Sequence, residues 1–200
     1  MTMTPERFAT GLTYDAYKAA MSRNRDRVED NERKVVLDKE ATRFFGSLER
    51  PLNVVVLAED WCGDVIANLP VLGRLSKSAP KLNVRVFYRD QSPDLTERWL
   101  NQGKYQSIPV FAFFDEHFKE IGHWIERPAS VTELRAKKRK EVFAKDPAYG
   151  PPDGAVDQLP EDVRTRLQAE LQKMRDATTA FANAEVQREL RELVATVPVR

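Results

Sequence analysis

The residues with the clearest chemical potential lie between Glu59 and Asp64. Cys62 is the only cysteine among the 200 residues, and it follows Trp61 and precedes Gly63. The thiolate is the nucleophilic form of cysteine, and a helix N-terminus favours it because free backbone N–H groups and the helix dipole stabilise negative charge. The elements on either side therefore decide whether Cys62 could act as a nucleophile.

Those elements are a strand and a helix. Residues 53–58 read Asn-Val-Val-Val-Leu-Ala, and this β-branched apolar run predicts a central strand buried on both faces. From Val65 to Ser76 apolar residues recur at helical spacing, and Pro70 inside that helix should kink it. Cys62 thus lies where a strand ends and a helix begins.

These residues resemble the thioredoxin family. The family motif is Trp-Cys-Gly-Pro-Cys followed by a helix-kinking proline; here residues 61–65 read Trp-Cys-Gly-Asp-Val, with Pro70 at the matching place. A second motif, Ser107-Ile108-Pro109-Val110, resembles the family's cis-proline loop. The resemblance covers residues 50–145 and implies a thioredoxin-like α/β fold, a central mixed sheet flanked by helices. An N-terminal helical extension and a C-terminal helical tail would complete the chain.

The sequence departs from the family pattern at three positions. Asp64 replaces the usual proline, Val65 replaces the resolving cysteine, and Val56 replaces a buried aspartate that accepts a proton in the family. A single cysteine cannot form an intramolecular disulfide. The resemblance therefore implies a single-cysteine thiol-disulfide oxidoreductase in which Cys62 attacks a disulfide and an external thiol such as glutathione resolves the intermediate. No cofactor is expected.

A redox-inactive binding module is the alternative function. In that case the groove between Trp61 and Pro109 would hold a protein partner, and the missing resolving cysteine and the apolar Val56 favour this interpretation. By resemblance, both functions use the same substrate-binding set around Cys62: Trp61, Gly63, Asp64, Ile108 and Pro109.

The acidic neighbours of Cys62 allow opposite interpretations. Glu59 or Asp60 could replace the missing buried aspartate as a proton acceptor, or both could be solvated loop charges, which we favour. Asp64 disfavours a nearby thiolate by like-charge repulsion. We expect it to cap the helix by accepting backbone N–H bonds. For Ile108-Pro109 we expect a cis peptide, because the motif matches the family, rather than an ordinary trans proline at a strand start.

Composition excludes several other classes of protein. A net charge of +1 argues against a surface built for nucleic acid or anionic membrane, and no apolar run reaches membrane-spanning length. The basic run Arg135–Lys140 is best interpreted as a solvated helix end. His117 and His123, with one cysteine, give no metal-ligand spacing. Without the features of a signal peptide in its first residues, the chain is expected to be cytoplasmic, with Cys62 reduced at rest.

The remaining segments are expected to surround this site. We expect an N-terminal helical extension (1–50), a thioredoxin-like domain (51–145), a Pro/Gly linker (146–154) and a C-terminal amphipathic segment (155–200). Thr13 should cap one N-terminal helix, the charged stretch 23–34 is a junction or a solvated helix, and residues 35–48 suit a second helix. Strands are predicted at 82–88, 110–114 and 120–125, and helices at 93–101 and 129–144.

The C-terminal segment has helical periodicity from Glu161 to Thr196. It could form one long helix, or two helices with a break near Thr178-Thr179. We expect its apolar positions to pack back on the chain's own domain or on the N-terminal helices; the rival interpretation is a homodimer contact through this helix.

Overall fold

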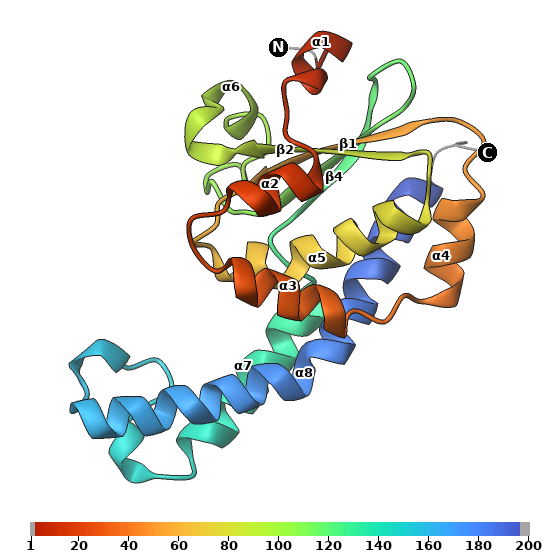
Figure 1. The fold of residues 1–200 in the computed structure, drawn as a ribbon. Coiled ribbons are helices and arrows are strands. Elements are labelled where there is room, and N and C mark those ends of the chain that lie inside the picture. The colour runs from red at the N-terminus through yellow and green to blue at the C-terminus, as the bar shows by residue number, and fades with distance from the viewer. Residues whose placement is uncertain (1–2, 197–200) are drawn as a thin grey trace. The chain divides into compact units, whose positions relative to one another are not determined.

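The computed structural model describes residues 3–196, and the sheet found among them has four strands, which Figure 1 shows together with the helices that flank it. They are β1 (Leu52–Ala58), β2 (Leu82–Tyr88), β3 (Val110–Phe114) and β4 (Glu120–Ile125). The sheet order is β2-β1-β3-β4; β1 and β2 are parallel, whereas the β1–β3 and β3–β4 pairs are antiparallel. The predicted thioredoxin-like mixed sheet flanked by helices is confirmed, and three of the strands have the predicted bounds.

The two central strands carry the core. Every residue of β1 and of β3 is buried, as expected for strands covered on both faces. Phe111 of β3 lies opposite Val56 of β1 and stacks on Trp124 of β4, with ring centroids 5.0 Å apart. The buried end of β1 therefore gives the following turn a rigid starting point.

The chain crosses from β1 to β2 through α5 (Gly63–Ser78). Its apolar face, including Ile66, Leu69 and Leu72, is buried, and Pro70 lies inside the helix as predicted. Helices α3 (Arg25–Lys34) and α4 (Lys39–Gly46) pack against α5. The N-terminal extension thus contacts the helix that Cys62 precedes.

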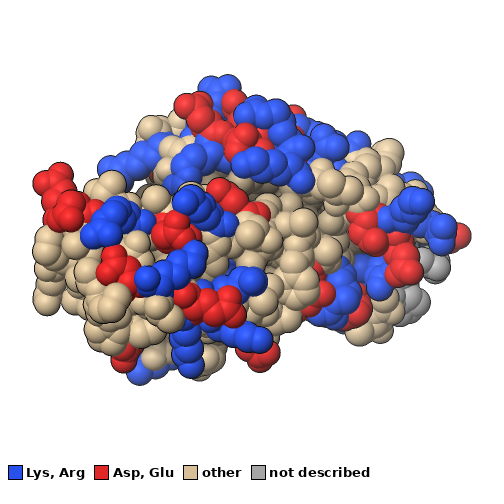
Figure 2. All heavy atoms as spheres, turned by 90° about the horizontal axis from the view of Figure 1, so that it is seen from below, with Lys and Arg blue, Asp and Glu red and all other residues tan. Residues whose placement is uncertain are grey.

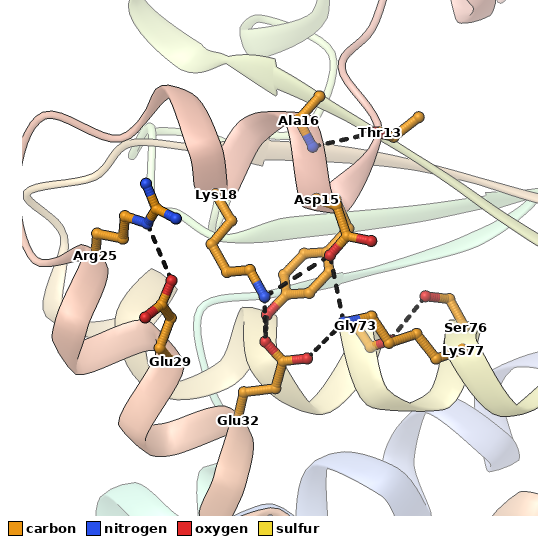
Figure 3. Close-up of polar contacts among 11 residues, drawn as sticks. Thr13, Asp15, Ala16, Lys18, Arg25, Glu29, Glu32, Gly73, Ser76 and Lys77 are labelled. Atoms are coloured by element: carbon orange, nitrogen blue, oxygen red, sulfur yellow. Dashed lines mark hydrogen bonds and ion pairs between the residues drawn. The ribbon is translucent and has the colours of Figure 1, made fainter.

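An ion-pair cluster joins α2 (Tyr14–Ala20) and α3 to α5. Figure 3 shows Glu32 of α3 between Lys18 of α2 and Lys77 of α5, with nitrogen–oxygen distances of 2.6 and 2.7 Å. The Tyr14 hydroxyl donates to the same carboxylate at 3.0 Å. The charged stretch 23–34 is therefore a helix rather than a junction. Most of its charged residues are exposed, but Val28 and Glu32 are buried.

The other N-terminal helices follow the predicted signals in part. The Thr13 hydroxyl accepts from the backbone N–H of Ala16 and caps α2, as expected, and a shorter helix α1 (Pro5–Ala9) precedes it. The predicted helix over 35–48 is wrong at its start, since Val35 to Asp38 are not helical and the Asp38 carboxylate caps α4. The β-branched pair Val35-Val36 explains the extended start.

The predicted helix over 93–101 is shorter in the structure. After a 3-10 turn (Arg89–Gln91), α6 spans only Pro93–Thr96. The Thr96 hydroxyl bonds to backbone oxygens of Arg89 and Ser92, and Trp99 turns inward to donate to Glu120 at 2.9 Å. These tertiary and side-chain bonds replace the helical ones.

Residues 128–185 form a second compact unit, and residues 1–127 with 186–200 form the first; residues 1–2 and 197–200 lie outside the described part. The second unit holds α7 (Ala129–Phe143), 3-10 turns at Pro147–Tyr149 and Val156–Gln158, and the start of α8. Within the predicted linker Tyr149 is buried and contacts Phe143, so this segment packs rather than acting as a free spacer.

The C-terminal segment is one helix, α8 (Glu161–Ala195), without a break at Thr178. Leu167 and Leu171 are buried within the second unit, and Val186, Leu190 and Val194 are buried in the core of the first. These apolar positions therefore pack back on the chain itself, as expected. The homodimer contact stays a prediction.

Candidate active site

Cys62 lies at the N-terminus of α5, as the sequence predicted, and occupies its N-cap position. Its backbone N–H donates to the carbonyl of Glu59 at 3.2 Å, and its own carbonyl accepts the first helical bond, from Ile66, at 3.0 Å. The end of β1 and this tight turn fix the sulfur at the helix N-terminus. The side chain is partly exposed, so a disulfide could reach it.

The loop before β3 lies on the other side of the site, opposite the turn that carries Cys62. The Ile108-Pro109 peptide bond is cis, as predicted, and both residues are buried. The Cys62 thiol donates to the Ile108 carbonyl with a sulfur–oxygen distance of 3.5 Å. The structure thus brings together the two motifs, which lie 46 residues apart in the chain.

Trp61 forms an exposed aromatic surface beside the thiol, with 46% of the residue accessible. The Arg89 guanidinium lies 5.0 Å from its ring centroid and also donates to the Gln106 carbonyl at 3.2 Å. Arg89 therefore connects Trp61 to the segment that leads into the cis-proline loop. Nothing local in the sequence marked Arg89, because its role depends on two distant segments.

Glu59 and Asp60 are not solvated loop charges, contrary to expectation. Glu59 is 8% exposed and accepts a hydrogen bond from the backbone of Asp90 at 2.9 Å. Asp60 accepts from the Ser22 backbone, the Ser22 hydroxyl and the Arg23 backbone at 2.9 to 3.0 Å.

Burial raises the pKa of Asp60, but these hydrogen bonds outweigh it, and the pKa lies below the ordinary value. A carboxylate with a lowered pKa is a weaker base. We therefore do not assign the proton-acceptor role to Asp60, and for Glu59 that role stays a prediction.

Asp64 has a different position from the predicted cap. The cap position belongs to Cys62, and Asp64 lies in the first turn of α5. Both of its carboxylate oxygens are 2.7 Å from the same guanidinium nitrogen of Arg127. Arg127 also pairs with Glu126, so it offsets only part of the like-charge repulsion expected at Cys62.

A polar network around Glu126 supports the cis-proline loop. Glu126 donates its backbone N–H to the Pro109 carbonyl at 2.8 Å, and its carboxylate binds Arg127 and Asn101. Its φ of 68° lies in the left-handed region, which a glutamate rarely adopts. Such strain persists where surrounding contacts require it. Sequence reasoning missed Glu126, since no residue pattern signals a strained backbone.

The remaining predicted positions differ in their exposure. Gly63 is exposed, whereas Val56 and Val65, at the places of the family's aspartate and resolving cysteine, are fully buried. Among residues 3–196 no group of three or more His, Cys, Asp or Glu side chains could hold a metal ion. His117 is exposed, and His123 contacts Glu120.

Charge is distributed evenly on the face drawn in Figure 2, where basic and acidic side chains alternate instead of gathering by sign. Within the predicted basic run, Arg135 contacts Thr178, and Arg139 donates to the Pro152 carbonyl. No helix among the described residues has the length and apolar character needed to span a bilayer.

Comparisons with known proteins agree with this architecture. Residues 11–140 match a family model described as thioredoxin, whereas no curated protein matches the sequence. Among solved structures, an HIV epitope scaffold aligns with a TM-score of 0.64 and 18% identity over 96% of this chain and 97% of the scaffold. A protein of unknown function from Pseudomonas aeruginosa aligns with a TM-score of 0.61 and 20% identity, over 88% and 99% of the two chains. At these identities the likeness concerns the fold alone.

Proposed function

Because this chain belongs to the thioredoxin family, we propose that it is a single-cysteine thiol-disulfide exchange protein that acts through Cys62. The observation that carries the proposal is the position of the sulfur. It is partly exposed at the N-terminus of α5 and lies 3.5 Å from the carbonyl of Ile108, directly before cis-Pro109. A disulfide that reaches Cys62 would therefore lie against the cis-proline loop.

The reaction has two exchange steps. The Cys62 thiolate attacks one sulfur of a substrate disulfide, so that a new sulfur–sulfur bond forms to Cys62 and the old bond breaks, releasing the other sulfur as a thiolate. An external thiol, glutathione in our proposal, then attacks the substrate sulfur and releases Cys62. Each step makes one sulfur–sulfur bond and breaks one, so no further oxidant or reductant is needed. The proton that the external thiol loses when it attacks is taken up by the thiolate released in the first step.

The external thiol is needed because the chain offers no internal one. Val65, one helical turn after Cys62, is fully buried and aliphatic. Trp61, with Arg89 on its ring, and the wall formed by Ile108 and Pro109 would hold the substrate on either side of the sulfur. We place this reaction in the cytoplasm, with protein or small-molecule disulfides as substrates and no cofactor.

The test compares Cys62 with a matched thiol elsewhere. The reference is a double variant, Cys62→Ser with Ala155→Cys, in which the lone thiol lies in an exposed loop. We expect the wild-type protein to react with oxidised glutathione about tenfold faster than the reference, and added glutathione to release the mixed disulfide. Equal rates, or reaction only after unfolding, would exclude the exchange function.

One observation favours the alternative of a redox-inactive binding module. The hydrogen bond to the Ile108 carbonyl uses the proton of the thiol, and a thiolate could not make it. If Cys62→Ser captures the same proteins as the wild type from a lysate, and neither forms a mixed disulfide, the binding module is the better description.

A further inference from the structure

The backbone of Glu126 connects the two sides of the site. Its N–H donates to the Pro109 carbonyl at 2.8 Å, and its own carbonyl accepts a hydrogen bond from the Asn68 side chain, also at 2.8 Å. Asn68 is buried on α5, the helix that Cys62 precedes. One residue therefore joins the cis-proline loop to the helix that has the sulfur at its N-terminus.

The side chain of Glu126 holds the backbone in the conformation that makes these two bonds. A φ of 68° costs free energy for a glutamate, so surrounding contacts must maintain it. The carboxylate accepts from Asn101 at 3.0 Å and from Arg127 at 2.5 Å. The Asn101 amide also donates to Ser107 of the loop at 3.2 Å. Without the carboxylate, the backbone could relax to a negative φ, which would turn its N–H and carbonyl away from their partners.

The direct bond between Cys62 and the loop depends on the protonation state of the sulfur. The thiol donates its proton to the Ile108 carbonyl at 3.5 Å. Exchange starts from the thiolate, and neither the thiolate nor the mixed disulfide has a proton to donate. The bonds of Glu126 do not involve the sulfur. They can therefore hold the loop against α5 after the direct bond is lost.

Building on the proposed function, we propose that Glu126 is a positioning residue for disulfide exchange. It keeps the Ile108-Pro109 loop in place relative to α5, so that a disulfide lying on the loop stays aligned with the Cys62 thiolate. Glu126 takes no part in the bonds that are made and broken. Alignment is nevertheless important for the rate, because displacing reacting groups by about 1 Å can slow a reaction about a hundredfold.

Glu126→Ala tests this role because it removes the carboxylate and allows the backbone to relax. We expect Cys62 to react with oxidised glutathione about tenfold more slowly than in the wild type. Alkylation by iodoacetamide needs the thiolate but no alignment with the loop. Its rate should stay equal or rise, because a displaced Ile108 carbonyl no longer stabilises the protonated thiol. A merely structural role would not separate these two rates.

Glu116→Ala is the matched control. Glu116 is also a carboxylate paired with an arginine, Arg50 at 2.7 Å, but it lies in the turn between β3 and β4, at the other end of the same hairpin. Both rates should therefore equal those of the wild type.

Glu126→Gln keeps the size of the side chain and an oxygen that can accept one of its two bonds, so it also serves if the alanine variant does not fold. Its exchange rate should lie between those of the wild type and Glu126→Ala, with alkylation no slower than in the wild type. An exchange rate equal to that of the wild type, or a loss shared equally by exchange and alkylation, would refute the role of the side chain.

The outcomes separate this role from the exchange function itself. If Glu126→Ala exchanges as fast as the wild type, or loses exchange and alkylation by the same factor, Glu126 does not position the loop for exchange. The exchange function still stands in that case, provided that wild-type Cys62 reacts faster than the Ala155→Cys reference. If the wild type is no faster than the reference, the exchange function fails, and the role of Glu126 fails with it.

Discussion

Neutralising Glu32 should weaken the attachment of the N-terminal helices to α5. In Glu32→Gln the side chain keeps its size but loses the charge that Lys18 and Lys77 share at 2.6 and 2.7 Å. The remaining acid near these lysines, Asp15, is 3.7 and 3.3 Å away with 68% of its side chain exposed, so it replaces little of the lost attraction.

The magnitude follows from the pKa of Glu32. Burial acts to raise it, but the hydrogen bonds from Lys18, Lys77 and Tyr14 prevail and lower it from 4.5 to about 2. At about 1.4 kcal/mol for each pKa unit, the ionised form is favoured in the folded state by about 3 kcal/mol. Because Lys77 is partly exposed, we expect Glu32→Gln to lose about 2 to 3 kcal/mol of unfolding free energy at neutral pH.

The pH dependence has a definite sign. A folded-state pKa below the ordinary value means that Glu32 stabilises the fold fully above pH 4.5 and progressively less as the pH falls toward about 2. The wild type should therefore lose stability across this window while Glu32→Gln does not lose this contribution. The difference between the two proteins should shrink as the pH falls.

Tryptophan fluorescence during urea unfolding is the appropriate assay. Trp61, Trp99 and Trp124 all lie in the unit that contains the Glu32 cluster, so the signal reports on that unit. Asp30→Asn on the same helix is the control, because Asp30 pairs with Lys34 at an exposed position and should give no measurable change. A Glu32→Gln protein as stable as the wild type at neutral pH, or a difference independent of pH, would refute the reasoning.

Two further predictions concern residues of α5. Gly73→Ala should destabilise the protein by about 1 to 3 kcal/mol, because the new Cβ would lie 2.5 Å from the buried Tyr14 ring. Replacing a glycine inside a helix usually increases stability instead. Gly46→Ala is the control: its new Cβ would meet nothing within 4 Å, so this variant should not lose stability in the same urea titration. Val65→Cys should form an intramolecular disulfide with Cys62 under oxidising conditions, as the family motif implies. Mass spectrometry after thiol alkylation would detect the disulfide. Two alkylated cysteines after oxidation would contradict the prediction.

Much of the fold was predictable because its signals are local. The strand over residues 110–114 is a run of five residues that are all buried, and apolar runs of this kind predict buried strands without knowledge of their partners. The turn at Cys62 was likewise predictable, since the strand, the turn and the helix are consecutive. The helix over 93–101 was not, because Trp99 leaves the helical path to bond Glu120, which follows it by 21 residues.

Charged residues were harder to interpret because their partners are distant. Glu59, Asp60 and Asp64 all lie within three residues of Cys62, with no visible partners in the local sequence. In the structure they bind groups 31, 38 and 63 residues away: Asp90, Ser22 and Arg127. The electrostatic environment of the Cys62 sulfur therefore cannot be deduced from the charged residues beside it in the sequence, because it also depends on the distant partners of those residues.

This distribution of partners also changes what counts as the site. The acids that flank Cys62 are held by groups from other elements, and Ser22, one of those groups, directly follows α2. Helix α2 also carries Tyr17, which is buried and packs on Tyr88 at the end of β2. Because both residues precede the first strand, a fragment that begins at residue 51 would keep both motifs and yet lack part of the site. Such a fragment, if folded, should react with disulfides more slowly than the full chain, and an equal rate would show that the motifs alone determine the reactivity of Cys62.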